Sequence, residues 1–283
     1  MEWKPKFLVD EDKVKILQDS LGVPFEIANL LVQRGIDDFD SAKKFFRPEL
    51  SDLHDPFLML GMEAAVNRIS TAIISQEKVM VYGDYDVDGT TSVALVFSYL
   101  NSYYSDCIYY IPDRYDEGYG ISKKGIDYAE KESISLIIAL DCGINALDNV
   151  AYAKELGIDF IICDHHLPGI NLPDAIAILD PKQNNCNYPF KELCGCGIGF
   201  KLIQALSQER GFSLETILPY LDLVAMAIAA DIVPIFGENR ILTHYGLMQI
   251  QEYPREGIKL FIAGLKRKLN VSDLVFVIAP RIN

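Results

Sequence analysis

The sequence has little positive charge and no long apolar run. Its 283 residues include 26 Lys and Arg against 40 Asp and Glu, a formal net charge of −14. This balance argues against a surface that holds nucleic acid by bulk charge, although acids that bind divalent metals also count as negative. The apolar run at 223–230 is far shorter than the roughly 20 residues of a membrane span. The charged N-terminus does not resemble a signal peptide, so we expect a cytoplasmic protein with no membrane partner.

Several common motifs are also missing. The six cysteines are scattered, and Cys194-Gly-Cys196 is one residue shorter than a usual zinc knuckle and has no second pair. We therefore expect reduced core thiols, with neither a disulfide framework nor a zinc site. No GxGxxG follows a predicted strand, which weighs against a dinucleotide-binding oxidoreductase.

The chain divides by periodicity into three parts. Residues 1–60 carry apolar residues at helical spacing in short pieces, which predicts a helical lead-in. Helical stretches then alternate with five β-rich runs, at 79–83, 107–112, 136–140, 159–163 and 175–179. This alternation predicts an α/β fold over 61–270, an open, mainly parallel five-stranded sheet flanked by helices, with a helical C-terminal part. The last residues, VFVIAPRIN at 275–283, are predicted to begin as a strand.

Acids and histidines follow three of the predicted strands. They are Asp84, Asp86 and Asp88 after the first strand, Asp141 after the third, and Asp164, His165 and His166 after the fourth. Because the carboxyl ends of parallel strands meet at one edge, we expect these side chains to converge there. Farther along, Asp231 interrupts the apolar helix predicted at 221–233, where a buried carboxylate is costly unless it meets a cation.

Carboxylates mixed with imidazole are typical ligands of Mn²⁺, Mg²⁺ or Fe²⁺, and so many acids would repel one another without metal. Two such ions would activate a water and stabilise a phosphoryl group. Thr90 and Thr91 open a helix whose free N–H groups could receive a phosphate. The alternative stays open for each residue taken alone, since Asp-rich turns are common loops and Asp141 and Asp164 could be helix caps.

Four motifs together resemble those of the DHH phosphoesterase superfamily. They are YGDYDVDGTTS at 82–92, ALDCG at 139–143, CDHH at 163–166 and the helix that carries Asp231. Within this superfamily, the residues of the first motif are similar to those of the RecJ family of single-strand-specific exonucleases. The same holds for PDRYDEGYG at 112–120, GCGIGFKL at 195–202 and APRIN at 279–283. The resemblance covers roughly residues 60–283.

The resemblance implies a centre of two Mn²⁺ or Mg²⁺ ions. Its ligands would be Asp84, Asp86, Asp88, Asp141, His165 and Asp231, with Asp141 bridging the ions. His166 would face the scissile phosphate as a hydrogen-bond donor or acid, and Asp164 would orient the histidines. The sequence departs from the superfamily at Tyr82, where many members carry a metal-binding histidine, which makes Asp84 the expected substitute.

The same resemblance implies hydrolysis of single-stranded DNA from its 5′ end in recombination and repair. Single-stranded DNA is the expected partner, with a single-strand-binding protein or a helicase as further candidates. Residues 271–283 would begin a linker to a DHHA1 domain missing from this chain. Candidate phosphate contacts, besides Thr90 and Thr91, are Arg114, Lys123, Lys124, Arg281 and the LKRKL cluster at 265–269; candidates for base stacking are Tyr85, Tyr115 and Tyr119.

Two other classes of function remain open at this point. An oligoribonuclease, a cyclic-dinucleotide phosphodiesterase or a manganese pyrophosphatase would keep the metal centre and change the substrate. A non-catalytic DHH scaffold that binds replication proteins would be expected to lose metal ligands, whereas the acids and both histidines are present here.

Overall fold

The computed structural model describes residues 10–264 and 267–283 and divides into two compact units, residues 1–53 and 54–283. The first unit contains the helices α1 (Glu11–Leu21), α2 (Phe25–Val32) and α3 (Phe39–Phe46). Its small core has a spacing typical of amphipathic helices and consists of Val14, Leu17, Ala28, Leu31, Ile36 and Ala42. Asp10 and Asp38 cap α1 and α3 through their carboxylates.

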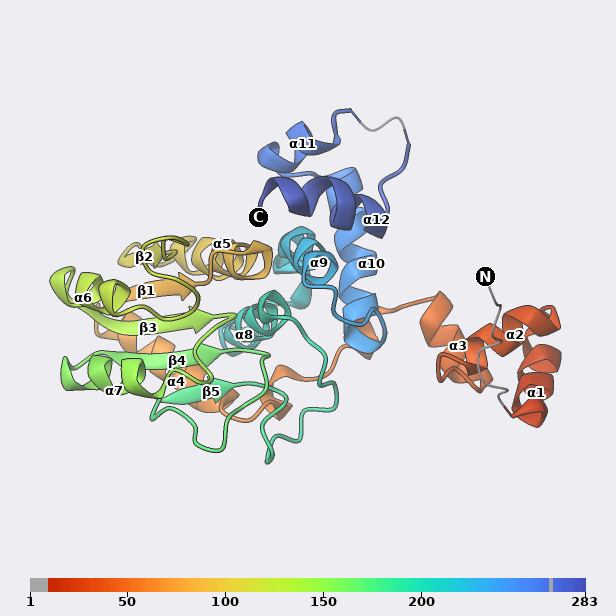
Figure 1. Ribbon diagram of the computed structural model, residues 1–283, viewed down its shortest axis with the longest axis horizontal. Coiled ribbons are helices and arrows are strands. Elements are labelled where there is room, and N and C mark those ends of the chain that lie inside the picture. The colour runs from red at the N-terminus through yellow and green to blue at the C-terminus, as the bar shows by residue number, and fades with distance from the viewer. Residues whose placement is uncertain (1–9, 265–266) are drawn as a thin grey trace. The chain divides into compact units, whose positions relative to one another are not determined.

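The second unit is built on a parallel sheet, which confirms the predicted fold class (Figure 1). The strands are β1 (Lys78–Gly83), β2 (Cys107–Tyr110), β3 (Ile134–Leu140), β4 (Asp159–Cys163) and β5 (Ala177–Leu179). They lie in the order β2-β1-β3-β4-β5, and every neighbouring pair is parallel. The strand order therefore reverses between β1 and β3, which is where ligands bind in open sheets of this kind.

Helices cover both faces of the sheet, as buried parallel strands require. On one face lie α6 (Lys123–Lys131) and α7 (Leu147–Glu155), and on the other lie α4 (Met62–Ile74), α5 (Val87–Asn101) and α8 (Gly195–Glu209) (Figure 1). The core under α6 and α7 includes Met80, Ile137 and Phe160, all buried. Helices thus cover both faces of the sheet, and a ligand can reach the strands only at the edges and ends of the sheet.

The C-terminal part is helical and differs from the sequence predictions in two places. It contains α9 (Leu221–Ala230), α10 (Gly237–Glu252), α11 (Glu256–Ile262) and α12 (Val271–Asp273), which continues through a π turn (Leu274–Ile278) and a 3-10 turn (Ala279–Arg281). The predicted strand at 275–283 is wrong, because Asn270 and Asp273 form a capping box that starts a helix. Leu274 and Ile278, four residues apart, are both buried.

The end of α9 is the second difference. The helix stops at Ala230, and Asp231 is its C-cap, followed by Ile232 with a φ of 57°. The predicted helix over 221–233 is therefore too long, since this left-handed residue and the nearby Pro234 end it. As a result, Asp231 is not enclosed by the helix bundle, and its side chain keeps 30% of its exposure.

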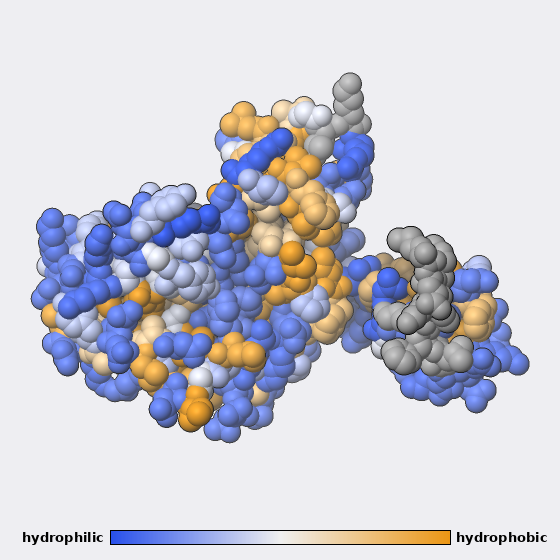
Figure 2. All heavy atoms as spheres, in the orientation of Figure 1, coloured by the Kyte–Doolittle hydropathy of each residue, from blue (hydrophilic) through white to orange (hydrophobic). Residues whose placement is uncertain are grey.

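Apolar residues are exposed on this C-terminal part. Phe236, Leu260 and Phe276 are 52%, 81% and 77% exposed, and Figure 2 shows hydrophobic residues gathered over α10 to α12. Among the described residues no single helix is long and apolar enough to cross a membrane; the bent pair Leu50–Leu58 and Met62–Ile74 reaches that length and composition only when the two segments are taken together.

Candidate metal centre

The strands end level with one another, and an acid follows four of them. Register pairs join Gly83 to Leu140, Leu140 to Cys163 and Cys163 to Leu179. The next residues are Asp84, Asp141, Asp164 and Asp180, all buried. The amide of Asp141 continues the ladder by donating to the carbonyl of Cys163 at 2.8 Å, and that of Asp164 donates to Leu179 at 3.0 Å. The aligned register is thus what gathers these acids at one edge.

The loop after β1 places its three acids in different ways. Asp84 is fully buried, and its Oδ1 lies 3.5 Å from the amide of Gly120. Asp86 caps α5, accepting a hydrogen bond from Gly89 N at 2.9 Å. Asp88 lies in the first turn of α5 and accepts bonds from the first two amides of α8, each at 2.7 Å. All three carboxylates are therefore held by backbone amides, which keeps them at the sheet edge.

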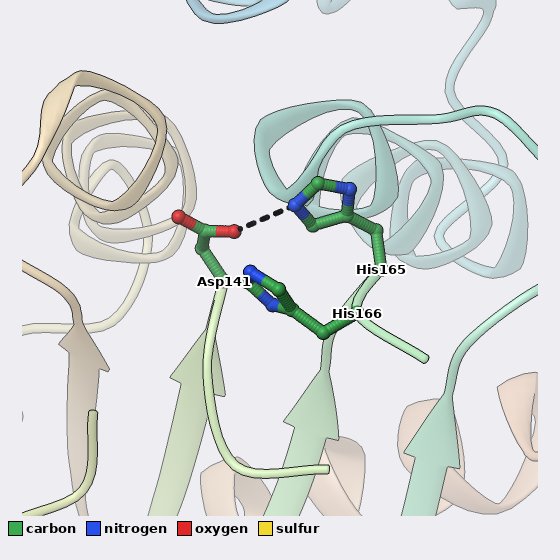
Figure 3. A group of neighbouring side chains, drawn as sticks. All are labelled: Asp141, His165 and His166. Carbon is green, nitrogen blue, oxygen red and sulfur yellow. Dashed lines mark ion pairs between the residues drawn. The ribbon is translucent and has the colours of Figure 1, made fainter. Parts of the chain in front are cut away.

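His165 lies at the centre of the remaining acids. Its Nε2 is 3.2 Å from Asp141 Oδ1, 3.6 Å from Asp231 Oδ2 and 3.8 Å from Asp88 Oδ2. Figure 3 shows Asp141 and His165 facing each other from the ends of β3 and β4, with His166 beside them. Two groups offer ligand atoms close enough to share an ion: Asp141, His165 and His166, and Asp88, His165 and Asp231.

Several buried polar atoms of this cluster lack a hydrogen bond. Asp84 Oδ2, Asp141 Oδ1 and His165 Nδ1 are buried and take part in no hydrogen bond. A buried polar atom without a partner costs free energy, and so few are expected in a native protein. Carboxylate oxygens and imidazole nitrogens are ligands that suit Mn²⁺ and Mg²⁺. The residues present therefore fit a divalent metal centre.

The acids affect one another's ionisation strongly. Burial, reinforced by the charge of Asp231, raises the pKa of Asp88 to about 7. Burial and the neighbouring Asp88 raise the pKa of Asp141, and burial and Asp86 raise that of Asp231 to about 6. Burial lowers the pKa of His165 to about 4, so this imidazole is neutral at pH 7. A nearby cation would reverse this balance by stabilising every carboxylate in its charged form.

Asp164 and His166 form a separate pair beside the cluster. Asp164 Oδ1 accepts hydrogen bonds from both histidine amides and lies 2.7 Å from His166 Nδ1, while Oδ2 accepts from Ile144 N at 2.9 Å. Burial alone would raise the pKa of Asp164, but the bonds from His166 and Ile144 outweigh it and lower this pKa. The bond to Asp164 in turn raises the pKa of His166. The other ring nitrogen, Nε2, lies 3.2 Å from the hydroxyl of Tyr119.

The predicted contacts at the start of α5 are not arranged for a ligand. The Thr91 hydroxyl is buried and donates to the carbonyl of Val87 at 2.6 Å, and the Thr90 hydroxyl donates to Asp86 O at 2.6 Å. Threonine in a helix commonly bonds back to the preceding turn. The amides of Gly89 and Thr90 are also bonded to Asp86. The expectation of free N–H groups here is therefore corrected.

Arg114 and Arg281 lie on exposed parts of the chain. The Arg114 guanidinium lies 4.4 Å from the centroid of the Tyr85 ring and donates to Asn283 Oδ1 at 2.9 Å. Arg281 ends the 3-10 turn that follows α12 and is exposed. A cavity of about 280 Å³ lies between this segment and the acids; its lining includes Asp86, Asp88, Asp231, Val275, Pro280 and Asn283.

The other candidates have varied positions. Tyr119 contacts both Tyr85 and His166 edge-on, and Tyr115 is 92% exposed. Lys123 lies over the Tyr152 ring, on the α6 side of the sheet. Lys124 is exposed in the first turn of α6. The LKRKL cluster falls partly on residues 265–266, which are outside the described residues.

Tyr82 is part of the core and does not reach the acids. It stacks on Tyr110, donates a hydrogen bond to Gly120 O at 2.8 Å and accepts one from Ser122 N at 3.0 Å. It therefore supports the loop at 120–122, whose Gly120 amide faces Asp84.

Two residues at the edge were missed from the sequence. Asp180 follows β5 as the other acids follow their strands, so the same rule could have identified it. Lys182 donates from Nζ to the carbonyl of His165 at 2.6 Å, a contact between distant loops that the sequence does not reveal.

Fold and site together define a class of protein, an α/β domain with an acidic, histidine-containing centre at the switch point of a parallel sheet. The chain belongs to the DHH family, whose N-terminal domain profile matches residues 78–228. That match spans all five strands, α8 and most of α9, and so includes the candidate site except Asp231 and the C-terminal segment.

The relatives found by sequence include RecJ exonucleases. Over 277 residues the chain is 44% identical to the single-stranded-DNA-specific exonuclease RecJ of Bacillus subtilis (strain 168), which covers 97% of this chain and 34% of the relative. It is 39% identical over 237 residues to RecJ of Escherichia coli (strain K12), covering 79% of this chain and 41% of that one.

Solved structures agree with the sequence relatives. RecJ from Thermus thermophilus in complex with Mn²⁺ has a TM-score of 0.81 at 26% identity, over 97% of this chain and 39% of that one. A structure of exonuclease RecJ bound to manganese has a TM-score of 0.73 at 31% identity, over 83% and 58%. The chain thus spans less than two thirds of the length of each of these relatives.

Proposed function

We propose that this chain carries the catalytic centre of a two-metal phosphodiesterase that removes nucleotides from the 5′ end of single-stranded DNA. The observation that carries the proposal is the convergence of Asp88, Asp141 and Asp231 on the Nε2 atom of His165. The names of the relatives support the substrate, since they are single-stranded-DNA-specific exonucleases. A role in recombination and repair follows from the same resemblance, with a single-strand-binding protein or a helicase as a candidate partner.

The ions would be Mn²⁺ or Mg²⁺, in keeping with the manganese bound in two similar structures. The chain's own ligands would be Asp86, Asp88, Asp141, His165 and Asp231, with the buried Asp84 beside them. When bound, such ions supply a reactive water at neutral pH and charge that stabilises the attacked phosphate. The neutral state of His165 fits a ligand, because a protonated imidazole cannot bind a metal.

The pair of Asp164 and His166 would bind the substrate phosphate through His166 and donate a proton to it. Asp164 accepts from His166 Nδ1 and so fixes the ring with Nε2 turned away from the carboxylate. The raised pKa of His166 favours the protonated ring, which can donate from Nε2 to a phosphate oxygen or to the leaving oxygen. Tyr119 lies within hydrogen-bond distance of this nitrogen and would be displaced or shared when a phosphate enters.

Arg114 and Arg281 are the proposed contacts for the rest of the substrate phosphate. Both are exposed, and Arg114 is already held against the Tyr85 ring, which leaves its planar guanidinium partly oriented. The cavity between the acids and residues 275–283 would receive the terminal nucleotide.

The test is digestion of 5′-labelled single-stranded DNA, duplex DNA, RNA and a dinucleotide, with Mn²⁺ and with EDTA. We expect Mn²⁺-dependent release of mononucleotides from single strands, abolished in Asp141→Ala and unchanged in the matched control Asp148→Ala, an exposed acid in α7. Cleavage of only RNA or the dinucleotide would reject the substrate class. Full activity of Asp141→Ala would reject the site.

A further inference from the structure

The first turn of α8 holds a carboxylate from another helix. Gly195 N and Cys196 N donate to Asp88 Oδ2 and Oδ1, each at 2.7 Å. The next two amides are satisfied by Cys194, through its sulfur at 3.4 Å and its carbonyl at 3.0 Å. The first two amides of α8 thus both donate to Asp88, an acid 107 residues earlier in the chain. Charge-assisted bonds of this kind at a helix N-terminus are strong and directional.

The close approach depends on the absence of a side chain at Gly195. A Cβ atom there would lie 2.6 Å from Asp141 Cβ, 2.7 Å from Asp141 Oδ1 and 2.9 Å from Asp141 Cα. Asp141 has little freedom to move away, because its amide is bonded to Cys163 O and its side chain is 2% exposed. Its φ of 58° also fixes an uncommon backbone conformation. Any residue larger than glycine must therefore displace either α8 or Asp141.

We propose that Gly195 is a positioning residue of the metal centre. Because Gly195 lacks a side chain, α8 can donate hydrogen bonds to both oxygens of Asp88 and pack directly against Asp141. These contacts set the separation and orientation of two proposed ligands. Each Asp88 oxygen keeps a further lone pair after accepting one hydrogen bond from an amide. The two hydrogen bonds therefore orient the carboxylate and leave both oxygens able to bind a metal ion. This role rests on the proposed metal-dependent function.

The first experiment measures Mn²⁺ binding by calorimetry to Gly195→Ala and to a matched control, Gly199→Ala. Gly199 lies on the same helix and is buried, but a Cβ there would contact Val96 and Leu140 at 3.3 and 3.6 Å, away from the acids. Both changes add one methyl group to a buried glycine of α8. We expect Gly195→Ala to weaken Mn²⁺ binding about 10- to 100-fold, the usual effect of losing support around a metal ligand, and Gly199→Ala to change it less than about twofold. A folded Gly195→Ala with wild-type affinity would overturn the proposal.

The second experiment needs no metal and decides the case if Gly195→Ala does not fold. Amide hydrogen exchange in EDTA should show Gly195 and Cys196 protected in the wild type and exchanging at least tenfold faster in Asp88→Ala. Asp148→Ala is the control, because Asp148 is an exposed acid in α7. Unchanged protection of these two amides in Asp88→Ala would refute the hydrogen bonds between α8 and Asp88. A wild-type protein that binds no Mn²⁺ would instead overturn the proposed function, and with it the metal role of Gly195.

Discussion

Replacing Asp180 with Asn should stabilise the protein more at pH 8 than at pH 5. Asp180 is fully buried after β5, where its Oδ1 accepts a bond from Lys182 N at 2.7 Å and its Oδ2 has no hydrogen-bond partner. Burial raises the pKa of this carboxyl from 3.8 to about 7. Asparagine keeps the shape and the oxygen that accepts from Lys182 but cannot ionise.

The sign follows from linkage. The folded-state pKa lies above the unfolded value, so between the two the unfolded chain holds fewer protons, and the free energy of unfolding falls as pH rises. For pKa values of 3.8 and about 7, the loss is about 1.7 kcal/mol at pH 5 and about 4 kcal/mol at pH 8. Asp180→Asn has no ionisable group here and does not lose this free energy. The difference in unfolding free energy between the variant and the wild type should therefore grow by about 2–3 kcal/mol in favour of the variant from pH 5 to pH 8.

The assay is urea unfolding of both proteins in EDTA at pH 5 and pH 8, with the change in stability compared between the two pH values. The exposed Asp148→Asn serves as the control and should show no such growth. A difference between wild type and Asp180→Asn that is the same at both pH values, or that shrinks at pH 8, would refute the assignment of a buried carboxyl with a raised pKa.

Three further results are expected. Asp164→Asn removes the charged partner of His166 Nδ1 and should lower the single-turnover rate of DNA hydrolysis about 10²- to 10⁴-fold; a rate within twofold of wild type would contradict the role of the pair. Lys201→Met leaves the buried Glu238 without its counter-ion at 2.6 Å and should cost about 3–5 kcal/mol of unfolding free energy in urea, whereas Lys154→Met, in an exposed pair, should cost little. Mn²⁺ at one hundred times the wild-type Kd should raise the unfolding free energy by about 2.7 kcal/mol for each ion bound; the same gain in Asp141→Ala at that Mn²⁺ concentration would place the metal elsewhere.

The sheet was predictable because its signal is local. Each strand is a short apolar run, and the alternation with helices determines that neighbouring strands are parallel. The position of Asp84, Asp141 and Asp164 at one edge then follows from strand polarity alone. The family resemblance added the proposed roles of the individual side chains, which strand order does not supply.

What could not be predicted depends on contacts between distant residues or on caps. The hydrogen bond from Gly195 of α8 to Asp88 joins residues 107 positions apart, and no local pattern at Gly195 reveals its partner. The apolar run at 274–278 suited a strand as well as a helix, and the capping box before it decided the outcome. The helix predicted over 221–233 includes Asp231 because the left-handed turn at Ile232, which ends α9, has no glycine to signal it.

The position of the metal centre can be tested by a crystal structure of the protein grown with Mn²⁺, with anomalous diffraction used to locate the metal. We expect two anomalous peaks at the carboxyl end of the sheet, both within coordination distance of Asp141 and one beside His165. Ordered Mn²⁺ found only elsewhere on the protein, with this edge empty, would contradict the proposed metal centre.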